Sequence, residues 1–179
     1  MLQVAIHPAP YRRLGNSRDI KLKTLSRSPA SILGLGSNQS IDINCIQTAF
    51  EVGVNYFFFY NLSYESFISG LQPLLKQQRE KILVATGSEY REKKALKKYL
   101  DLVHQRLNLE VLDLFFLEYV SPADDFATIQ AMLEELYRWQ EQGLIRYVGV
   151  TVHNRAIAMK LIEERKVELH LLVLVGVRY

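Results

Sequence analysis

The chain has 179 residues, of which 49% are hydrophobic and 23% charged, and its formal net charge is +3. This composition is typical of one soluble globular domain, and the small charge gives no indication of nucleic-acid or membrane binding. The single cysteine, Cys45, excludes an intrachain disulfide, and without a CxxC partner we expect no metal site. We find no signal peptide and no apolar stretch long enough to span a bilayer, so we expect a cytoplasmic protein.

The first 31 residues differ from the rest of the chain. They are polar and basic, contain prolines and show no clear hydrophobic period. We therefore predict an N-terminal extension or hairpin over residues 1–31 and a single domain over residues 32–179.

Six short apolar runs, rich in β-branched and aromatic residues, recur along the domain. Each run is nearly continuous rather than alternating, as expected for parallel strands that are buried on both faces. The predicted strands are Ile32–Leu35, Val54–Phe59, Lys81–Thr86, Val111–Glu118, Ile145–Val150 and Leu169–Val175.

Apolar residues at helical spacing lie between these runs and predict five helices. Serine residues precede four of them and are predicted to cap the helix N-termini: Ser40, Ser63, Ser88 and Ser121. The fourth helix places either Trp139 or Gln140 on its buried face, and the fifth has its stripe at Ala156, Met159, Lys160 and Ile162. A basic cluster, Arg91–Lys98, is predicted to be the solvated face of the third helix.

Strand and helix thus alternate five times before a sixth strand, which predicts a parallel sheet with right-handed crossovers. Two architectures fit this order: an open doubly wound sheet and part of a (β/α)8 barrel. A closed barrel typically needs about 250 residues and eight strands, so a chain with six strands would form an incomplete one.

Several stretches match one family in order. They are YRRLG at Tyr11–Gly15, LGLGS at Leu33–Ser37, AFEVGVNYF at Ala49–Phe57, LDLFFLE at Leu112–Glu118 and QGLIRYVGVT at Gln142–Thr151. Together they resemble the aldo-keto reductases, which are (β/α)8 barrels that transfer hydride from NADPH to a carbonyl. The resemblance implies an α/β fold, a parallel (β/α) barrel of TIM type that is incomplete, with about six strands and five helices.

The resemblance also implies where a catalytic tetrad should lie. In the family a tyrosine donates a proton, a lysine lowers the pKa of that tyrosine, an aspartate holds the lysine and a histidine orients the carbonyl. The corresponding positions here hold Ser63, Gly87, Phe58 and Glu118 in that order. Tyr64 lies one position from the expected tyrosine and is the remaining candidate for the proton donor.

Glu118 is the exception among these substitutions. A branch of the family that reduces carbon–carbon double bonds carries a glutamate at that place, although that branch keeps the other three residues. We therefore name Tyr64 and Glu118 as the candidate catalytic residues.

The resemblance assigns a serine and an asparagine after the fifth strand to the nicotinamide carboxamide. Thr151 could stand for the serine, whereas Val152 cannot replace the asparagine and leaves His153 or Asn154 to do so. The sequence ends at Val177–Tyr179, before the segments that hold the cofactor phosphates in the family. We expect a truncated barrel in which NADP binding is weak or lost.

Three functions remain open. The leading hypothesis is an aldo-keto reductase-like protein that is impaired or inactive as a carbonyl reductase. The second is a divergent NADP-dependent oxidoreductase that uses Tyr64 and Glu118 on a small carbonyl substrate, as the front part of a longer chain. The third is a non-catalytic interaction module that self-associates through open barrel edges, where backbone N–H and C=O groups lack partners.

Overall fold

The computed structural model describes residues 22–37, 41–163 and 170–172, and in them strands and helices alternate along the chain. The strands are β1 (Leu35–Gly36), β2 (Tyr56–Phe59), β3 (Leu83–Ser88), β4 (Leu112–Val120), β5 (Ile145–Val152) and β6 (His170–Leu172). The helices are α1 (Asn44–Glu51), α2 (Glu65–Gln78), α3 (Lys93–Leu107), α4 (Phe126–Glu141) and α5 (Arg155–Glu163), with a short 3-10 helix η1 (Arg79–Lys81) after α2.

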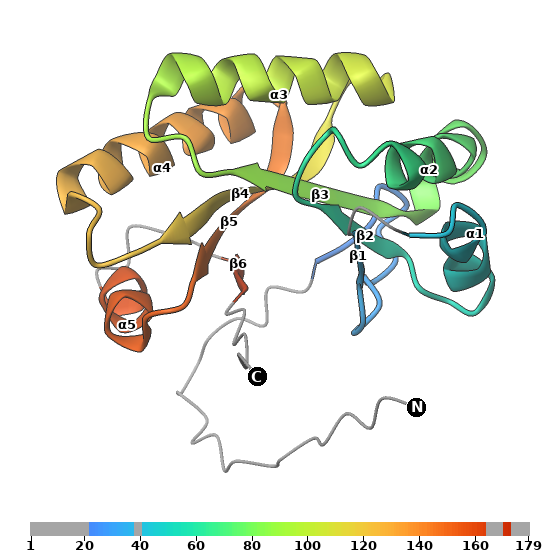
Figure 1. The fold of residues 1–179 in the computed structure, drawn as a ribbon, viewed down its shortest axis with the longest axis horizontal. Coiled ribbons are helices and arrows are strands. Elements are labelled where there is room, and N and C mark those ends of the chain that lie inside the picture. The colour runs from blue at the N-terminus through green and yellow to red at the C-terminus, as the bar shows by residue number, and fades with distance from the viewer. Residues whose placement is uncertain (1–21, 38–40, 164–169, 173–179) are drawn as a thin grey trace, which may run out of the picture.

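The six strands form one parallel sheet in the order β1-β2-β3-β4-β5-β6. The helices follow one another in an arc along one side of this sheet (Figure 1). A doubly wound sheet would instead reverse its strand order at a switch point and carry helices on both faces. The sequential order and the one-sided helices confirm the prediction of an incomplete (β/α) barrel.

The sheet separates two apolar clusters, and β2 contributes to both of them. Phe57 and Phe59 are fully buried in the outer cluster, between the sheet and the helices. Phe58 points to the opposite face and packs in the inner cluster with Leu83 and Phe116. Side chains alternate between the faces because the strand period is two. The aromatic run thus supplies the core on both sides of one strand.

A short N-terminal segment crosses the inner face near the amino ends of the strands. Lys23 and Pro29 form an antiparallel bridge, and Leu22 and Ala30 pack against the inner cluster. The backbone N–H of Lys23 donates a hydrogen bond to the Tyr147 hydroxyl. The predicted boundary between residues 1–31 and 32–179 stays a prediction, and residues 1–21 lie outside the described residues.

The first strand does not lie where the sequence predicts it. It begins at Leu35, and the preceding Ile32 and Leu33 are exposed to 102% and 75%. The fifth helix is also rotated relative to its predicted stripe, since Ala158 and Leu161 are buried while Met159 is 47% exposed. Both errors have the same cause, because a short apolar run has no strong periodicity to fix its register.

The predicted serine caps are wrong for three helices. Tyr64, Glu92 and Asp125 precede α2, α3 and α4 in place of Ser63, Ser88 and Ser121, and Ser40 lies outside the described residues. Among these three, only the Asp125 side chain accepts a capping hydrogen bond, from the Thr128 N–H. The loops after the strands continue for several residues before each helix starts, which moves the caps downstream. No helix within the described ranges is long and apolar enough to cross a membrane.

Candidate functional site

The carboxyl ends of β2, β3, β4 and β5 lie together at one end of the sheet, opposite the N-terminal segment. Barrel enzymes place their catalytic residues at this end of the strands. Phe58 lies beside Ala85 in the register of β2 and β3, and Gly87 lies beside Phe116 in that of β3 and β4. Three of the positions that the resemblance assigns to catalysis, Phe58, Gly87 and Glu118, therefore lie together on neighbouring strands.

Phe58 fills an apolar place on the inner face. It is 7% exposed, and its ring packs edge-on against Tyr60 at 4.4 Å and Phe116 at 5.7 Å between centroids. Such edge-to-face packing is the geometry that aromatic pairs prefer. The Phe58 ring carries no charge that could hold a cation, so Phe58 is a core residue.

Gly87 leaves no room for a side chain. A Cβ atom at this position would lie 2.5 Å from the Phe116 carbonyl oxygen and 2.7 Å from Glu118 Cγ. Real Cβ atoms essentially never approach other heavy atoms within 3.0 Å, and the first of these neighbours is backbone. A lysine here would therefore require β4 to move and the Glu118 side chain to leave.

Glu118 takes up the space above Gly87. Its exposed fraction is 2%, and its Oε1 atom has no hydrogen-bond partner among the described residues. Burial, with a smaller contribution from the charge of Glu89, raises the pKa of Glu118 to about 8. The carboxyl is thus protonated at neutral pH and can donate as well as accept a hydrogen bond.

Three rings follow one another across the carboxyl ends of the strands. They belong to Tyr60, Tyr119 and His153, and we call them the aromatic rim. Tyr119 lies nearly parallel to Tyr60 at 6.5 Å and to His153 at 5.7 Å between ring centroids. The three rings come from the ends of β2, β4 and β5. Burial and the charge of Glu118 both raise the pKa of Tyr60 and of Tyr119, so these phenols are poor acids at neutral pH.

An irregularity in β4 brings Tyr119 into the aromatic rim. Its backbone has the left-handed φ of 52°, and the register with β5 shifts between Leu117 and Val120. The N–H of Tyr119 donates to Thr151 Oγ1 at 2.8 Å. β-Bulges commonly redirect a side chain next to a functional site. The sequence gives no sign of this bulge, so the role of Tyr119 was not foreseen.

Tyr64, the candidate for the tyrosine proton donor, and Ser63, at the position that the resemblance assigns to it, lie away from the inner face. Tyr64 directly precedes α2 and packs against the outer cluster. Ser63 is exposed, and its backbone N–H donates to the side chain of Asn61. Tyr64 is still near enough for its charge to raise the pKa of Tyr60 and Tyr119. It therefore borders the aromatic rim without entering it.

The residues at the carboxyl end of β5 and just after it do not fit a nicotinamide amide well. Thr151 is 1% exposed, and its hydroxyl accepts the hydrogen bond that holds the β4 bulge. Val152 is buried and has no amide in its side chain. The Asn154 side-chain oxygen accepts hydrogen bonds from the N–H groups of Ala156 and Ile157 at the start of α5. His153 is exposed but stacks on Tyr119, so we derive no hydride transfer through this site.

Asp113 has a structural role at the other end of β4. It is fully buried, and its carboxylate contacts the Arg79 and Arg146 guanidinium groups, each at 2.7 Å. It also accepts a hydrogen bond from the Val84 N–H at 2.9 Å. This network links β4 to β3, β5 and η1. Within the described residues, no group of three His, Cys, Asp or Glu side chains could hold a metal ion.

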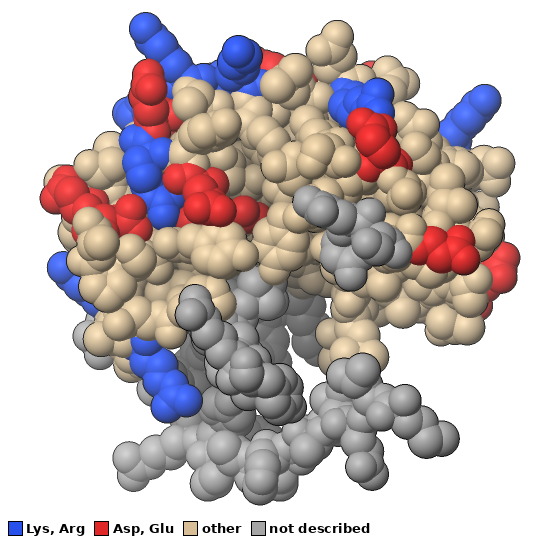
Figure 2. Space-filling view, viewed as in Figure 1, with Lys and Arg blue, Asp and Glu red and all other residues tan. Residues whose placement is uncertain are grey.

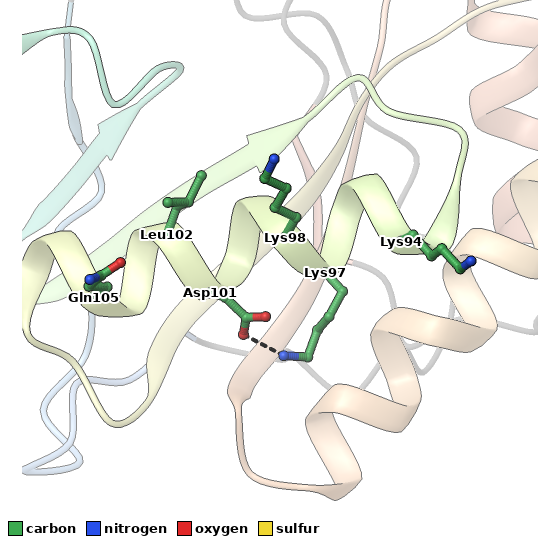
Figure 3. Close-up of a pocket in the computed structure, with 6 residues that line it drawn as sticks. All are labelled: Lys94, Lys97, Lys98, Asp101, Leu102 and Gln105. Carbon is green, nitrogen blue, oxygen red and sulfur yellow. Dashed lines mark hydrogen bonds and ion pairs between the residues drawn. The ribbon is translucent and has the colours of Figure 1, made fainter.

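The basic cluster Arg91–Lys98 lies mostly on the solvent side of α3, where Lys94, Lys97 and Lys98 border a shallow hollow (Figure 3). Much of its charge is compensated. Arg91 pairs with Asp124 at 2.9 Å, Lys97 pairs with Asp101, and Lys93 lies 3.9 Å from Glu135. Basic and acidic side chains are interspersed on the visible face of the molecule (Figure 2).

Comparisons with known proteins agree with this geometry. Residues 33–179 match the model of the aldo/keto reductase family. An aldose reductase from Schistosoma japonicum superposes with a TM-score of 0.66 at 16% identity, over 86% of this chain and 60% of that one. An aldo-keto reductase from Bacillus halodurans, solved in its holo form, gives a TM-score of 0.66 at 19% identity, over 86% of this chain and 57% of that one.

A third structure, a putative aldo-keto reductase from Pseudomonas aeruginosa, has a TM-score of 0.65 at 18% identity, over 82% of this chain and 64% of that one. These likenesses show a (β/α)-barrel fold. The chain belongs to the aldo/keto reductase family, and it spans about three fifths of the length of the solved structures that it matches. A search of curated protein sequences gave no match.

Proposed function

We propose that this chain is an aldo-keto reductase-like protein that does not carry out NADPH-dependent carbonyl reduction with the family's tetrad. The observation that carries the proposal is Gly87, where the Phe116 carbonyl oxygen would lie 2.5 Å from a Cβ atom. The family's lysine would start from this position. Phe58 supplies a ring where an aspartate would hold that lysine, so the cation and its partner are lost together.

Without the lysine cation, no tyrosine at this site can act as the proton donor. A phenol becomes a proton donor near neutral pH only when a neighbouring cation favours its anion. Tyr60 and Tyr119, which lie beside Glu118, instead have raised pKa values because of burial and nearby negative charge. Among the described residues Arg91 is a nearby cation, and its guanidinium is engaged with Asp124 and with the backbone oxygens of Glu89 and Glu118.

A direct assay tests the proposal. The chain is mixed with NADPH, and binding is followed by calorimetry and by the fluorescence of the reduced nicotinamide. Carbonyl-dependent oxidation is then followed with an aromatic aldehyde such as 4-nitrobenzaldehyde. We expect weak or no binding and no oxidation above the rate without protein. Tight binding with aldehyde-dependent oxidation would refute the proposal.

A second function, that of a divergent oxidoreductase, is favoured by the protonated state of Glu118. A buried carboxyl with a pKa of about 8 can serve as a proton donor at neutral pH. In this function Tyr64 and Glu118 would act on a small carbonyl or enone substrate. If any NADPH oxidation is seen, Glu118→Gln should abolish it, whereas a rate unchanged by Glu118→Gln would exclude this function.

A third proposal concerns self-association through the sheet edges. In the described part of the chain, β1 pairs only with β2 and β6 only with β5. Ile32 and Leu33, which shortly precede β1, are exposed to 102% and 75%. Unpaired edges beside exposed apolar side chains favour association. Sedimentation velocity should show oligomers that Leu33→Glu reduces, and a wild-type monomer would contradict this.

Because its one cysteine, Cys45, is free, we also propose a reducing, cytoplasmic location.

A further inference from the structure

The aromatic rim presents ring surface to solvent directly beside an unsatisfied acid. Tyr119 is 40% exposed, and His153 is exposed on its far side. Glu118 lies on the inner face next to Tyr60 and Tyr119, whose phenol groups both respond to its charge. Its buried Oε1 has no partner among the described residues, and such an atom costs free energy that a ligand donor would recover.

The charged groups around Glu118 determine whether a cationic or an anionic ligand is favoured. Glu89 follows β3 and raises the pKa of Glu118, while Tyr60, Tyr119 and Tyr99 of α3 contribute only neutral phenols. None of the ion pairs formed within the described residues involves Glu89 or Glu118. Arg91 lies here as well, but its guanidinium pairs with Asp124 at 2.9 Å and donates to the backbone oxygens of Glu89 and Glu118, so its charge is compensated. The carboxyl groups of Glu89 and Glu118 therefore disfavour an anion and attract a cation.

We propose that the aromatic rim binds a planar aromatic cation of the amidine or aminopyridine type, whose ring packs on Tyr119 and Tyr60 and whose paired N–H groups bind Glu118. Stacking and cation–π attraction favour a flat, positively charged ring over tyrosine faces. A carboxylate accepts two parallel N–H donors from such a group. This binding function goes beyond the proposed loss of reductase chemistry and does not depend on NADPH.

The protonation of Glu118 gives this binding a distinct signature. At neutral pH the free carboxyl holds a proton, because its pKa is about 8. A bound cation stabilises the carboxylate, so the O–H bond breaks and the proton passes to the buffer. Binding should therefore release close to one proton at about pH 6.5 and almost none at about pH 9.5, and affinity should rise with pH between them.

Benzamidine is the probe for this proposal, tested on the full 179-residue chain by calorimetry in two buffers of different ionisation enthalpy. Benzamide and benzoate are matched ligands of the same shape that carry no charge and a negative charge. We expect benzamidine to bind at least about tenfold more tightly than either of them. Similar affinity for all three, or binding without proton release at the lower pH, would overturn the proposal.

Two variants locate the site. Glu118→Gln has the size of the protonated acid and should fold, weaken benzamidine about tenfold or more, and abolish proton release. Tyr119→Leu should weaken binding severalfold and leave proton release intact. Asp101→Asn, on the outer surface of α3, is the control and should change neither quantity. If Glu118→Gln binds benzamidine as the unmodified chain does, the site is elsewhere and the proposal is wrong.

Discussion

Glu118 lies directly over Gly87, with its Cγ atom 2.7 Å from the point where a Gly87 side chain would begin. The two substitutions are therefore coupled in space. The long glutamate occupies the volume that a residue at position 87 would need, and the glycine makes room for the glutamate. Restoring either position alone to the family's residue would leave a clash or a gap.

Substitution of Gly87 should destabilise the fold. Gly87→Ala should lower the free energy of unfolding by about 1–3 kcal/mol, because the new Cβ atom meets the β4 backbone. Gly36→Ala is the matched control, since a Cβ atom there has no neighbour within 4 Å in the described part of the chain. Urea unfolding measures both, and equal effects of the two substitutions would show that the space over Gly87 is free.

Glu118 should make the stability depend on pH. Its pKa is about 8 in the folded chain and about 4.5 in the unfolded chain, so the unfolded state loses its proton first as the pH rises. The contribution of Glu118 is fully present below about pH 4.5, declines as the pH rises, and is lost by about pH 8. The slope approaches 1.4 kcal/mol per pH unit between these values.

Glu118→Gln isolates this contribution. The variant should be more stable than the unmodified chain above about pH 5, with a gain that grows to roughly 4 kcal/mol near pH 8 and then levels off. Urea unfolding at several pH values gives the difference. A difference that does not change with pH would mean that Glu118 is ionised in the folded chain.

Asp113 should contribute more to stability than any surface ion pair. Asp113→Ala leaves Arg79 and Arg146 without their shared carboxylate and the Val84 N–H without an acceptor. We expect a loss of about 3–5 kcal/mol. Asp101→Ala removes the exposed pair with Lys97 and should cost about 0.5 kcal/mol or less. Comparable losses for the two variants in thermal or urea unfolding would contradict this ranking.

Thr151 should hold the β4 bulge. Thr151→Val removes the acceptor of the Tyr119 N–H and should cost about 1–3 kcal/mol, because that group is left without a partner. Thr151→Ser keeps the hydroxyl and should retain most of the stability and the stacking of Tyr119 on His153. Proton NMR shifts of the His153 ring report this stacking. Unchanged shifts in Thr151→Val would show that the bulge does not depend on Thr151.

The order of strands and helices could be predicted from the local pattern of apolar residues in the sequence. Continuous apolar runs, spaced by helical stripes, were enough to predict parallel strands with helical crossovers, because each run must be buried on both faces. Trp139 is buried and Gln140 exposed, which resolves the one open choice in the fourth helix. The choice between a doubly wound sheet and a barrel could not be made from pattern alone, since both use the same repeat.

The substitutions at Phe58, Gly87 and Glu118 were visible in the sequence, because each occupies a position fixed by neighbouring strand motifs. Their consequence was not visible. Only the tertiary structure places the Glu118 side chain over Gly87, since the contact joins two strands whose register depends on the whole sheet. The aromatic rim likewise depends on the bulge in β4. Simple alternation along the strand would point Tyr119 to the other face of the sheet, and the bulge turns it toward the inner face. The sequence by itself determined which residues stand at positions 58, 87 and 118, and the packing of β4 against β3 and β5 decided how their side chains contact one another.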